Sequence, residues 1–313
     1  MSATAPSSPS SPSSPPSPST PPARTARFFA AYDALLARWS VPVEPLDVVT
    51  AHGTTRVNAC GPRDGRPLVL LQGGGATSAM WFAIAPALAA AGHRVLAVDL
   101  IGDPGRSVHD GPALGGIPGL MAWLDAVLDG LGIEEADVCG HSYGAWIAVE
   151  YALHAPGRVG RLALLDPTQV FAGFRPGYLL RVLPLFLPRH TADRARSYLA
   201  WESGDTPPLD AGCREVYALG YADFPASRTV TGPRPSAERL EALTAPTLAL
   251  YAERGRAHDA HRVAAATRRA LPAATVAVLP GLAHHNLPAA GAEEVNRRLA
   301  DFLARGNRSR PTG

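Results

Sequence analysis

The sequence predicts an α/β protein with a mostly parallel central sheet, helices on both faces of the sheet and a helical segment inserted between two strands. Short apolar runs alternate with segments of helical periodicity along most of the chain, which is typical of parallel strands joined by crossover helices. One interval of about eighty residues, between Asp166 and Thr247, contains helical patterns but no strand pattern. The composition, 46% hydrophobic and 18% charged residues, is ordinary for a globular protein with a large core.

The expected strands are short runs rich in apolar residues and bounded by turn signals. Two form a strand pair around the turn at Gly53, at Leu46–Thr50 and Thr55–Cys60. The other strands are expected at Pro67–Leu71, Val95–Asp99, Asp137–Gly140, Leu162–Asp166, Thr247–Tyr251 and Thr275–Leu279. Apolar residues recur at helical spacing in Ala26–Trp39, Met80–Ala91, Ile117–Leu131, Ala145–His154, Ala260–Ala270 and Glu293–Ala304.

Residues 167–242 are interpreted as a helical lid, because an insertion between consecutive sheet strands lies where strand ends open towards ligand. The core of the domain is then formed by residues 24–166 and 243–304. Residues 1–23, which are almost entirely Ser, Pro, Thr and Ala, have nothing to bury and are expected to form a disordered tail. Residues 305–313 are interpreted as a second, flexible tail.

Charge and cysteine usage exclude several function classes. A formal net charge of +2 indicates neither a nucleic-acid partner nor a membrane partner. All 29 basic residues are arginines, which excludes chemistry that needs a lysine, such as a Schiff base or a P-loop. The three cysteines lie far apart and are typical of a reduced, cytoplasmic protein. No apolar run approaches the ~18 residues of a membrane-spanning helix, and the first residues lack a secretory-signal pattern.

The strongest motif is Gly140-His141-Ser142-Tyr143-Gly144, which matches the G-x-S-x-G pattern of a nucleophile elbow. An expected strand ends immediately before it and an expected helix begins immediately after it. The turn between them is so tight that both flanking positions must lack bulk. The motif therefore predicts Ser142 as a nucleophile held clear of the sheet.

With this elbow, the chain resembles the α/β-hydrolase superfamily, and most closely its small bacterial carboxylesterase-like members. The resemblance covers most of residues 41–304. It implies the α/β-hydrolase fold and a serine hydrolase that cleaves a carboxylic ester or related acyl bond through an acyl-enzyme, with no cofactor and a small, apolar acyl substrate. Four further segments carry it: Leu71–Gly75, Asp99–Ser107, Leu165–Pro167 and Pro280–His284.

The same resemblance implies roles for individual residues. The family builds its oxyanion hole from two N–H groups, here those of Tyr143 and Gly74. The catalytic base corresponds to His284 in the Pro-Gly-x-x-His turn, with His285 interpreted as a loop histidine or a contact to substrate. The family often has His where this chain has Gln72, a departure that leaves the N–H donors in place.

The acid of the triad departs from the common pattern. Its usual place is a G-x-x-D-like phrase after the strand Thr247–Tyr251, but here that phrase ends in Gly255. Asp166 ends the preceding strand, and some members carry the acid there. It also keeps the order Ser…Asp…His, so Asp166 is predicted to orient the histidine. Glu253 is the alternative acid, and Asp259 is a third candidate.

Other readings of the polar residues are weaker. His258, Asp259 and His261 include an H-x-x-H spacing, but no Glu stands as in H-E-x-x-H, and no metal is expected. Asp99 and Asp103 are interpreted as residues of a structural turn. The same fold could serve thioester, lactone or C–C bond cleavage or acyl transfer. A non-catalytic small-ligand receptor is the alternative from another class, supported only by Gly255.

Removing residues 1–23 should change neither stability nor activity, because this segment has no large apolar side chain beyond Met1. A chain starting at Arg24 is expected to match the full chain in melting temperature and in ester turnover. A clear loss in either measurement would show that the segment docks onto the folded domain.

Overall fold

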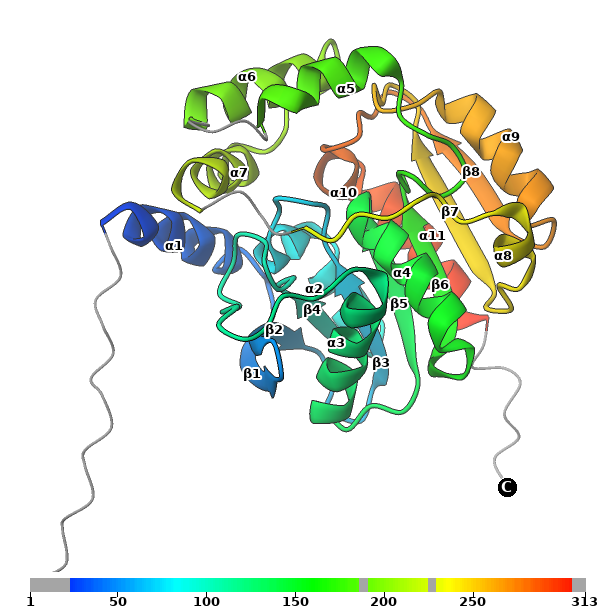
Figure 1. Cartoon of the computed structure of the whole chain (residues 1–313), viewed down its shortest axis with the longest axis horizontal. Coiled ribbons are helices and arrows are strands. Elements are labelled where there is room, and N and C mark those ends of the chain that lie inside the picture. Colours follow the sequence, from blue (N-terminus) through cyan, green and yellow to red (C-terminus); the bar gives the residue numbers. More distant parts are fainter. Residues whose placement is uncertain (1–22, 186–190, 225–228, 306–313) are drawn as a thin grey trace, which may run out of the picture.

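The computed structural model describes residues 23–185, 191–224 and 229–305, and its centre is an eight-stranded sheet (Figure 1). The strand order is β1-β2-β4-β3-β5-β6-β7-β8. β2 pairs antiparallel with β1 and β4, and all other neighbours are parallel. Most of the two expected tails, residues 1–22 and 306–313, lies outside the described residues. The strands are β1 (Glu44–Thr50), β2 (Gly53–Cys60), β3 (Arg66–Leu71), β4 (His93–Val98), β5 (Ala136–His141), β6 (Val159–Leu165), β7 (Thr247–Ala252) and β8 (Thr275–Leu279).

The central strands are apolar at most of their positions, with consecutive apolar residues such as Leu68–Leu71 in β3, because both of their faces are covered. In β3, Leu68 and Leu70 belong to one hydrophobic cluster while Val69 and Leu71 belong to another. This alternation follows from the strand geometry, in which successive side chains point to opposite faces. The two clusters therefore lie on the two sides of the sheet, and each needs its own layer of helices.

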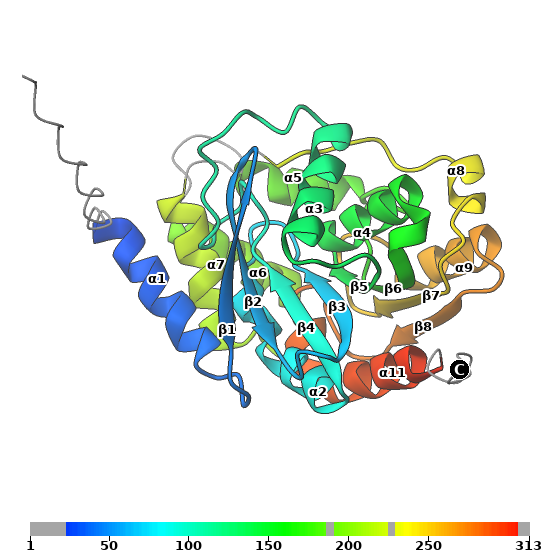
Figure 2. The same cartoon turned by 90° about the horizontal axis from the view of Figure 1, so that it is seen from below.

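Five helices supply those layers. Figure 2 shows α3 (Ile117–Gly130), α4 (Tyr143–His154) and α9 (Ala260–Ala270) on one side of the sheet, with α2 (Ala85–Ala90) and α11 (Ala292–Ala304) on the other. The helix expected at Met80–Ala91 is interrupted: a 3-10 helix spans Ser78–Ala83, and α2 begins anew with Pro86 in its first turn. Proline lacks the N–H that a continuing helix would need there. None of the helices in the described part of the chain is long and apolar enough to cross a membrane.

The insertion between β6 and β7 is helical, as the sequence predicts. It contains α5 (Pro176–Val182), α6 (Ala192–Ser203), α7 (Ala211–Asp223) and the short α8 (Ala237–Glu241). The N-terminal helix α1 (Ala23–Leu36), which the sequence assigns to the core, shares a separate hydrophobic cluster with α6 and α7. The ring of Phe28 on α1 meets that of Phe224, just after α7, edge to face at 4.6 Å. The predicted fold class, an α/β sheet with a helical insertion, is confirmed.

Asp99, at the end of β4, connects the N-terminal helix to the loops above the sheet. Its fully buried carboxylate accepts hydrogen bonds from the Ser78 amide and hydroxyl at 2.8 and 2.7 Å, from the Arg106 amide at 2.8 Å and from the Tyr32 hydroxyl at 2.9 Å. Burial raises the pKa of this carboxyl, and these bonds oppose the shift. The interpretation of Asp99 as a structural residue agrees with these contacts.

Candidate active site

Ser142 lies at the strained turn between β5 and α4. Its backbone has φ 53° and ψ −114°, a region that residues with a side chain rarely occupy. A Cβ added at Gly140 would overlap the Gly144 carbonyl, and one added at Gly144 would overlap the Leu71 carbonyl at the end of β3. Both glycines of the motif are therefore required by close approach of the backbone. The turn presents the serine side chain at the edge of the sheet where the parallel strands end.

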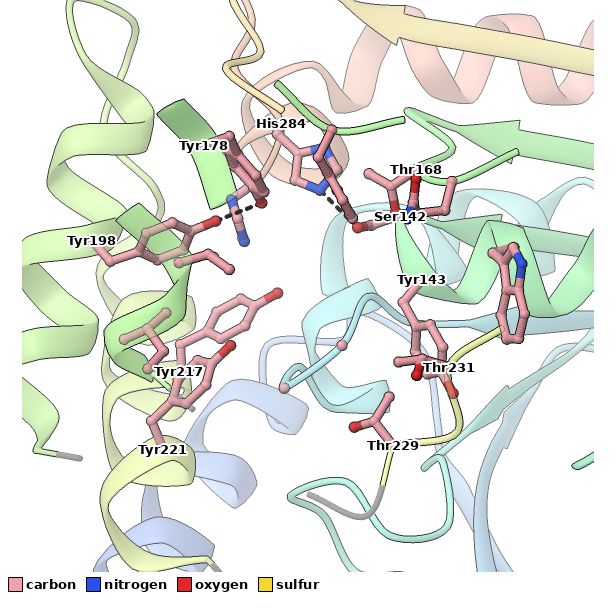
Figure 3. Close-up of a pocket in the computed structure, with 18 of the residues that line it drawn as sticks. Ser142, Tyr143, Thr168, Tyr178, Tyr198, Tyr217, Tyr221, Thr229, Thr231 and His284 are labelled. Carbon is pink, nitrogen blue, oxygen red and sulfur yellow. Dashed lines mark hydrogen bonds between the residues drawn. The ribbon is translucent and has the colours of Figure 1, made fainter. Parts of the chain in front are cut away.

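His284 lies between Ser142 and Asp166. It follows β8, and its ring is buried. Its Nε2 is 2.7 Å from Ser142 Oγ, and its Nδ1 is 2.6 Å from Asp166 Oδ2 (Figure 3 shows the serine contact). Since Nδ1–H donates to the carboxylate, Nε2 is left free to accept the serine proton. The three residues form one continuous hydrogen-bonded chain.

Asp166 is held by two groups besides the histidine. It directly follows β6 and has φ 44°, also in the left-handed region. Its Oδ1 accepts hydrogen bonds from the Ala252 amide at 3.2 Å and from His258 Nε2 at 3.1 Å. Burial opposes the charged form, but the charge of His258 and hydrogen bonds from His258 and His284 outweigh burial and lower the pKa of Asp166. The residue is therefore an anion aimed at His284.

Gly255 explains why the acid can stand at the end of β6. A Cβ added to Gly255 would lie 3.3 Å from Asp166 Oδ2, so the loops after β6 and β7 meet at one place. A carboxylate on Gly255 would crowd the one already present. Glu253, the alternative acid, points elsewhere: its carboxylate accepts a hydrogen bond from the Gly281 amide at 3.2 Å and lies 3.5 Å from the Arg254 side chain.

The surroundings of His284 favour its protonated form. Burial lowers the pKa of an imidazole, but the hydrogen bond to Asp166 and the charges of Asp166 and Glu202 outweigh burial and raise the pKa of His284. His141 differs: its Nε2 donates to the His284 carbonyl over 3.0 Å, and burial, with the neighbouring histidines, lowers its pKa to about 3. His141 is thus a neutral donor that holds the His284 backbone.

The two amides expected to form the oxyanion hole lie next to each other. A Cβ added to Gly74 would be 3.7 Å from the Tyr143 Cβ, and both residues line the cavity that contains Ser142. Within the described residues, neither N–H donates to a backbone or side-chain acceptor, whereas the next amide, Gly75 N–H, donates to Asp103 at 3.4 Å. Two unpaired donors beside a serine hydroxyl suit the binding of a developing oxyanion.

The model of the family described as alpha/beta hydrolase fold matches residues 66–288. The chain belongs to this family. It is 30% identical to carboxylesterase YbfK of Bacillus subtilis over 297 residues, 90% of this chain and 94% of that protein. The crystal structure of this carboxylesterase, also called CesB, is similar with a TM-score of 0.84 and 28% identity over 90% of this chain and 99% of that one. Naproxen esterase of the same organism has a TM-score of 0.80 and 25% identity over 91% and 99%. The predicted family and fold are confirmed.

Two residues near the site could not be assigned to it from the sequence. His258 stood there only in a candidate metal spacing, but its ring faces Asp166, whereas His261 is 72% exposed and lies 3.9 Å from Glu253. Among the described residues, no group of three His, Cys, Asp or Glu side chains is arranged to hold a metal ion. Glu202, on α6 of the insertion, accepts a hydrogen bond from the His284 amide at 3.0 Å. Its separation of 82 residues from the histidine leaves no local sequence signal.

Replacing Asp166 should be far more damaging than replacing Glu253. Asp166→Asn is expected to reduce turnover by about 10⁴-fold, the magnitude for the equivalent change in a serine protease, because the amide favours the wrong tautomer of His284. Glu253→Gln should lower turnover by much less, since its carboxylate contacts the β8 loop, Arg254 and His261 rather than His284. The KM of both variants should change little in steady-state assays.

The pH dependence provides a second measurement of the same arrangement. A raised pKa of His284 means that the base is lost as pH falls through a value above the ordinary 6.5, so the acidic limb of kcat/KM should lie above 6.5. Asp166→Asn removes the charge that raises this pKa and should move the limb to lower pH. A larger loss from Glu253→Gln than from Asp166→Asn, in folded proteins, would assign the acid to the later loop.

Proposed function

We propose that this α/β-hydrolase cleaves carboxylic esters through an acyl-enzyme formed on Ser142, with His284 as general base and Asp166 as the carboxylate that orients it. The observation that carries the proposal is the continuous chain of hydrogen bonds from Ser142 to Asp166, with contacts of 2.7 and 2.6 Å. The strained backbone of Ser142 supports it, because strain of this kind persists where it serves function. The 30% identity to carboxylesterase YbfK supports an ester as substrate.

In this mechanism His284 Nε2 takes the proton of the Ser142 hydroxyl as the serine attacks the ester carbonyl. The carbonyl oxygen becomes negative and is bound by the N–H groups of Gly74 and Tyr143. His284 then gives its proton to the departing alcohol, and an ester between Ser142 and the acyl group remains. Water activated by the same histidine attacks this ester, releases the carboxylic acid and restores the serine. Asp166 stays ionised throughout.

Ser142→Ala should abolish turnover and leave the fold intact. The expected loss leaves at most the residual rate that binding and the oxyanion hole alone provide. Turnover of a neutral aryl ester measures the loss of catalysis. Covalent labelling by a fluorophosphonate, detected by mass spectrometry, measures the loss of the nucleophile separately. Near wild-type hydrolysis by folded Ser142→Ala protein would refute the proposed function, and unlabelled but ligand-binding wild type would favour a receptor.

We further propose a neutral, largely apolar ester as substrate. The cavity beside Ser142 has a volume of about 320 Å³, and no Asp, Glu, Arg or Lys is among the described residues that line it. A charged substrate group would lose its hydration there without an opposite charge to replace it. The insertion, residues 167–242, supplies much of the wall and acts in this proposal as the lid. The aromatic lining residues include Tyr143, Trp146, Phe174, Tyr178, Tyr198 and Phe224.

Two tyrosines of α7 add a polar element to this wall. Tyr217 and Tyr221 are one helical turn apart with nearly parallel rings, and Figure 3 shows both hydroxyls directed into the cavity, across from Ser142. Burial raises the pKa of both phenols, so they stay neutral donors. The Tyr178 and Tyr198 hydroxyls bond to each other at 2.7 Å, but those of Tyr217 and Tyr221 have no partner within the described residues. They suit an uncharged oxygen of the substrate remote from the ester.

The reduced state of the cysteines supports the cytoplasm as the compartment, which we propose on this basis. Cys60, Cys139 and Cys213 are all free and buried. Burial raises the pKa of the Cys60 thiol to about 11 and that of Cys139 to about 12. Such thiols are unreactive, as is usual for structural cysteines in a reducing compartment.

Tyr217→Phe and Tyr221→Phe should discriminate between two matched aryl esters, one with an ether oxygen in its remote part and one with a methylene there. Loss of one hydrogen bond should lower kcat/KM for the ether about five- to tenfold and leave the methylene ester nearly unchanged. The control is Tyr251→Phe, a buried tyrosine outside the cavity whose hydroxyl contacts Thr267. Equal losses with both esters would show that the two hydroxyls do not recognise substrate.

A further inference from the structure

Glu202 is a buried carboxylate that the insertion brings to the loop of His284. It lies near the end of α6, and its side chain has no exposure to solvent. One carboxylate oxygen accepts the hydrogen bond from the His284 amide at 3.0 Å, and the other accepts one from the His285 amide at 3.3 Å. The second oxygen is also 3.2 Å from His285 Nδ1. Both oxygens of one side chain therefore bind two consecutive amides of the candidate catalytic loop.

The residues after Glu202 extend this attachment. Asn286 Nδ2 donates to Thr206 Oγ1 at 2.9 Å and to the Pro207 carbonyl at 2.6 Å, and its Oδ1 accepts from the Ala283 amide at 2.8 Å. The amides of His284 and His285 thus donate to Glu202, and Asn286 donates to the segment that follows α6. The amide of Ala283 donates to Asn286 itself. The loop after β8 is therefore hydrogen-bonded to the insertion through consecutive residues.

His284 is held from two sides through its main chain. From the core, His141 donates to its carbonyl at 3.0 Å. From the insertion, Glu202 accepts from its amide. Because both neighbours bind main-chain atoms, the imidazole remains free to contact Ser142 and Asp166. Displacing Glu202 would shift the histidine backbone and lengthen both ring contacts.

Glu202 also bears a charge whose compensation is incomplete. Within the described residues, its one ion-pair partner is the ring of His285, and burial lowers the pKa of that histidine and favours its neutral form. Burial raises the pKa of a carboxyl, but the hydrogen bonds from His285 and the positive charge of His284 when it is protonated outweigh burial and lower the pKa of Glu202, so Glu202 is an anion. A buried anion without a permanent cation beside it attracts any positive charge that forms nearby.

We propose that Glu202 is a positioning residue of the reaction: it fixes the backbone of His284 from the insertion, and its negative charge stabilises the imidazolium that forms when His284 takes the Ser142 proton. The inference rests on the proposed roles of Ser142 and His284. It gives the insertion a second task besides forming the cavity wall. The α6 end of the insertion is part of the catalytic framework, and it cannot swing away without moving the base.

Several other groups act on the same imidazole and belong in any interpretation of its titration. Asp166 faces its Nδ1 from the end of β6 and is itself held by His258. His141 faces it from β5 and His285 from its own loop, with ring centroids 5.0 and 4.9 Å away. Tyr178 of α5 and Tyr198 of α6, which interact electrostatically with Glu202, remain neutral because burial raises their pKa values.

The test compares Glu202→Gln, which removes the charge at nearly constant volume, with Glu202→Asp, which keeps the charge on a shorter side chain. In the full-length enzyme, Glu202→Gln should move the acidic limb of kcat/KM to lower pH by about one unit and lower kcat by up to about tenfold. KM should change little, because Glu202 does not line the cavity. Glu202→Asp should keep the limb near its wild-type position and lower kcat through displacement of the loop.

The matched control is Glu150→Gln. Glu150 is also fully buried, but it lies on α4 and pairs with Arg239 of α8 at 2.8 Å. This substitution should lower the melting temperature without moving the pH limb. An unmoved limb in folded Glu202→Gln protein would overturn the proposal. If Glu202→Gln does not fold, an unchanged kcat in Glu202→Asp would overturn it instead. Ser142→Ala separates this inference from the proposed function. If Ser142→Ala is inactive while Glu202→Gln behaves like the wild type, the role of Glu202 is rejected and the proposed function is not.

Discussion

The hydrogen bond between His284 Nδ1 and Asp166 Oδ2, 2.6 Å long, is the contact on which the geometry of the site depends. It fixes which nitrogen of the imidazole carries the proton and therefore which nitrogen faces Ser142. It can form only because β6 and β8 end at the same edge of a parallel sheet, with β7 between them. The strained φ of Asp166 and the absent side chain of Gly255 both follow from fitting a carboxylate into the space between those loops.

The two sides of His284 differ in charge. Behind the histidine lie two buried anions. Asp166 is held by the Ala252 amide and His258, and Glu202 is held by the amides of His284 and His285, with the His285 ring 3.2 Å away. In front of His284 lies a cavity whose described lining has no formal charge apart from the histidines. Because charges interact strongly in a medium from which water is excluded, the anions act mainly on the histidine between them. The neutral front leaves the amides of Gly74 and Tyr143, the proposed oxyanion donors, as the main electrostatic feature for a substrate to meet.

The helical insertion both forms the cavity wall and contacts the loop that carries His284. Its helices α5 to α7 form an aromatic wall, and they pack on α1, from the other end of the chain. The same insertion reaches the loop of His284 through Glu202, Thr206 and Pro207. The cavity wall and the proposed base are therefore connected, because a substrate packed against α6 would contact a helix that also binds the loop of His284. This coupling is a property of the tertiary structure, since none of these pairs is near in sequence.

The sequence by itself determined the features that depend on local periodicity and on backbone sterics. Alternating apolar strands and helices predicted the parallel sheet, and the two glycines around Ser142 marked the elbow because no other residue fits there. The resemblance to the α/β-hydrolase superfamily, rather than periodicity or sterics, pointed to His284 in its Pro-Gly-x-x-His turn. The helix expected at Met80–Ala91 was the main local error, since Pro86 starts a new helix. The sequence favoured Asp166 over Glu253 as the carboxylate that meets His284, and the structure has that contact. The tertiary structure alone decided what depends only on distance in space: that His258 holds this carboxylate, and that Glu202 reaches the histidine across 82 residues of chain.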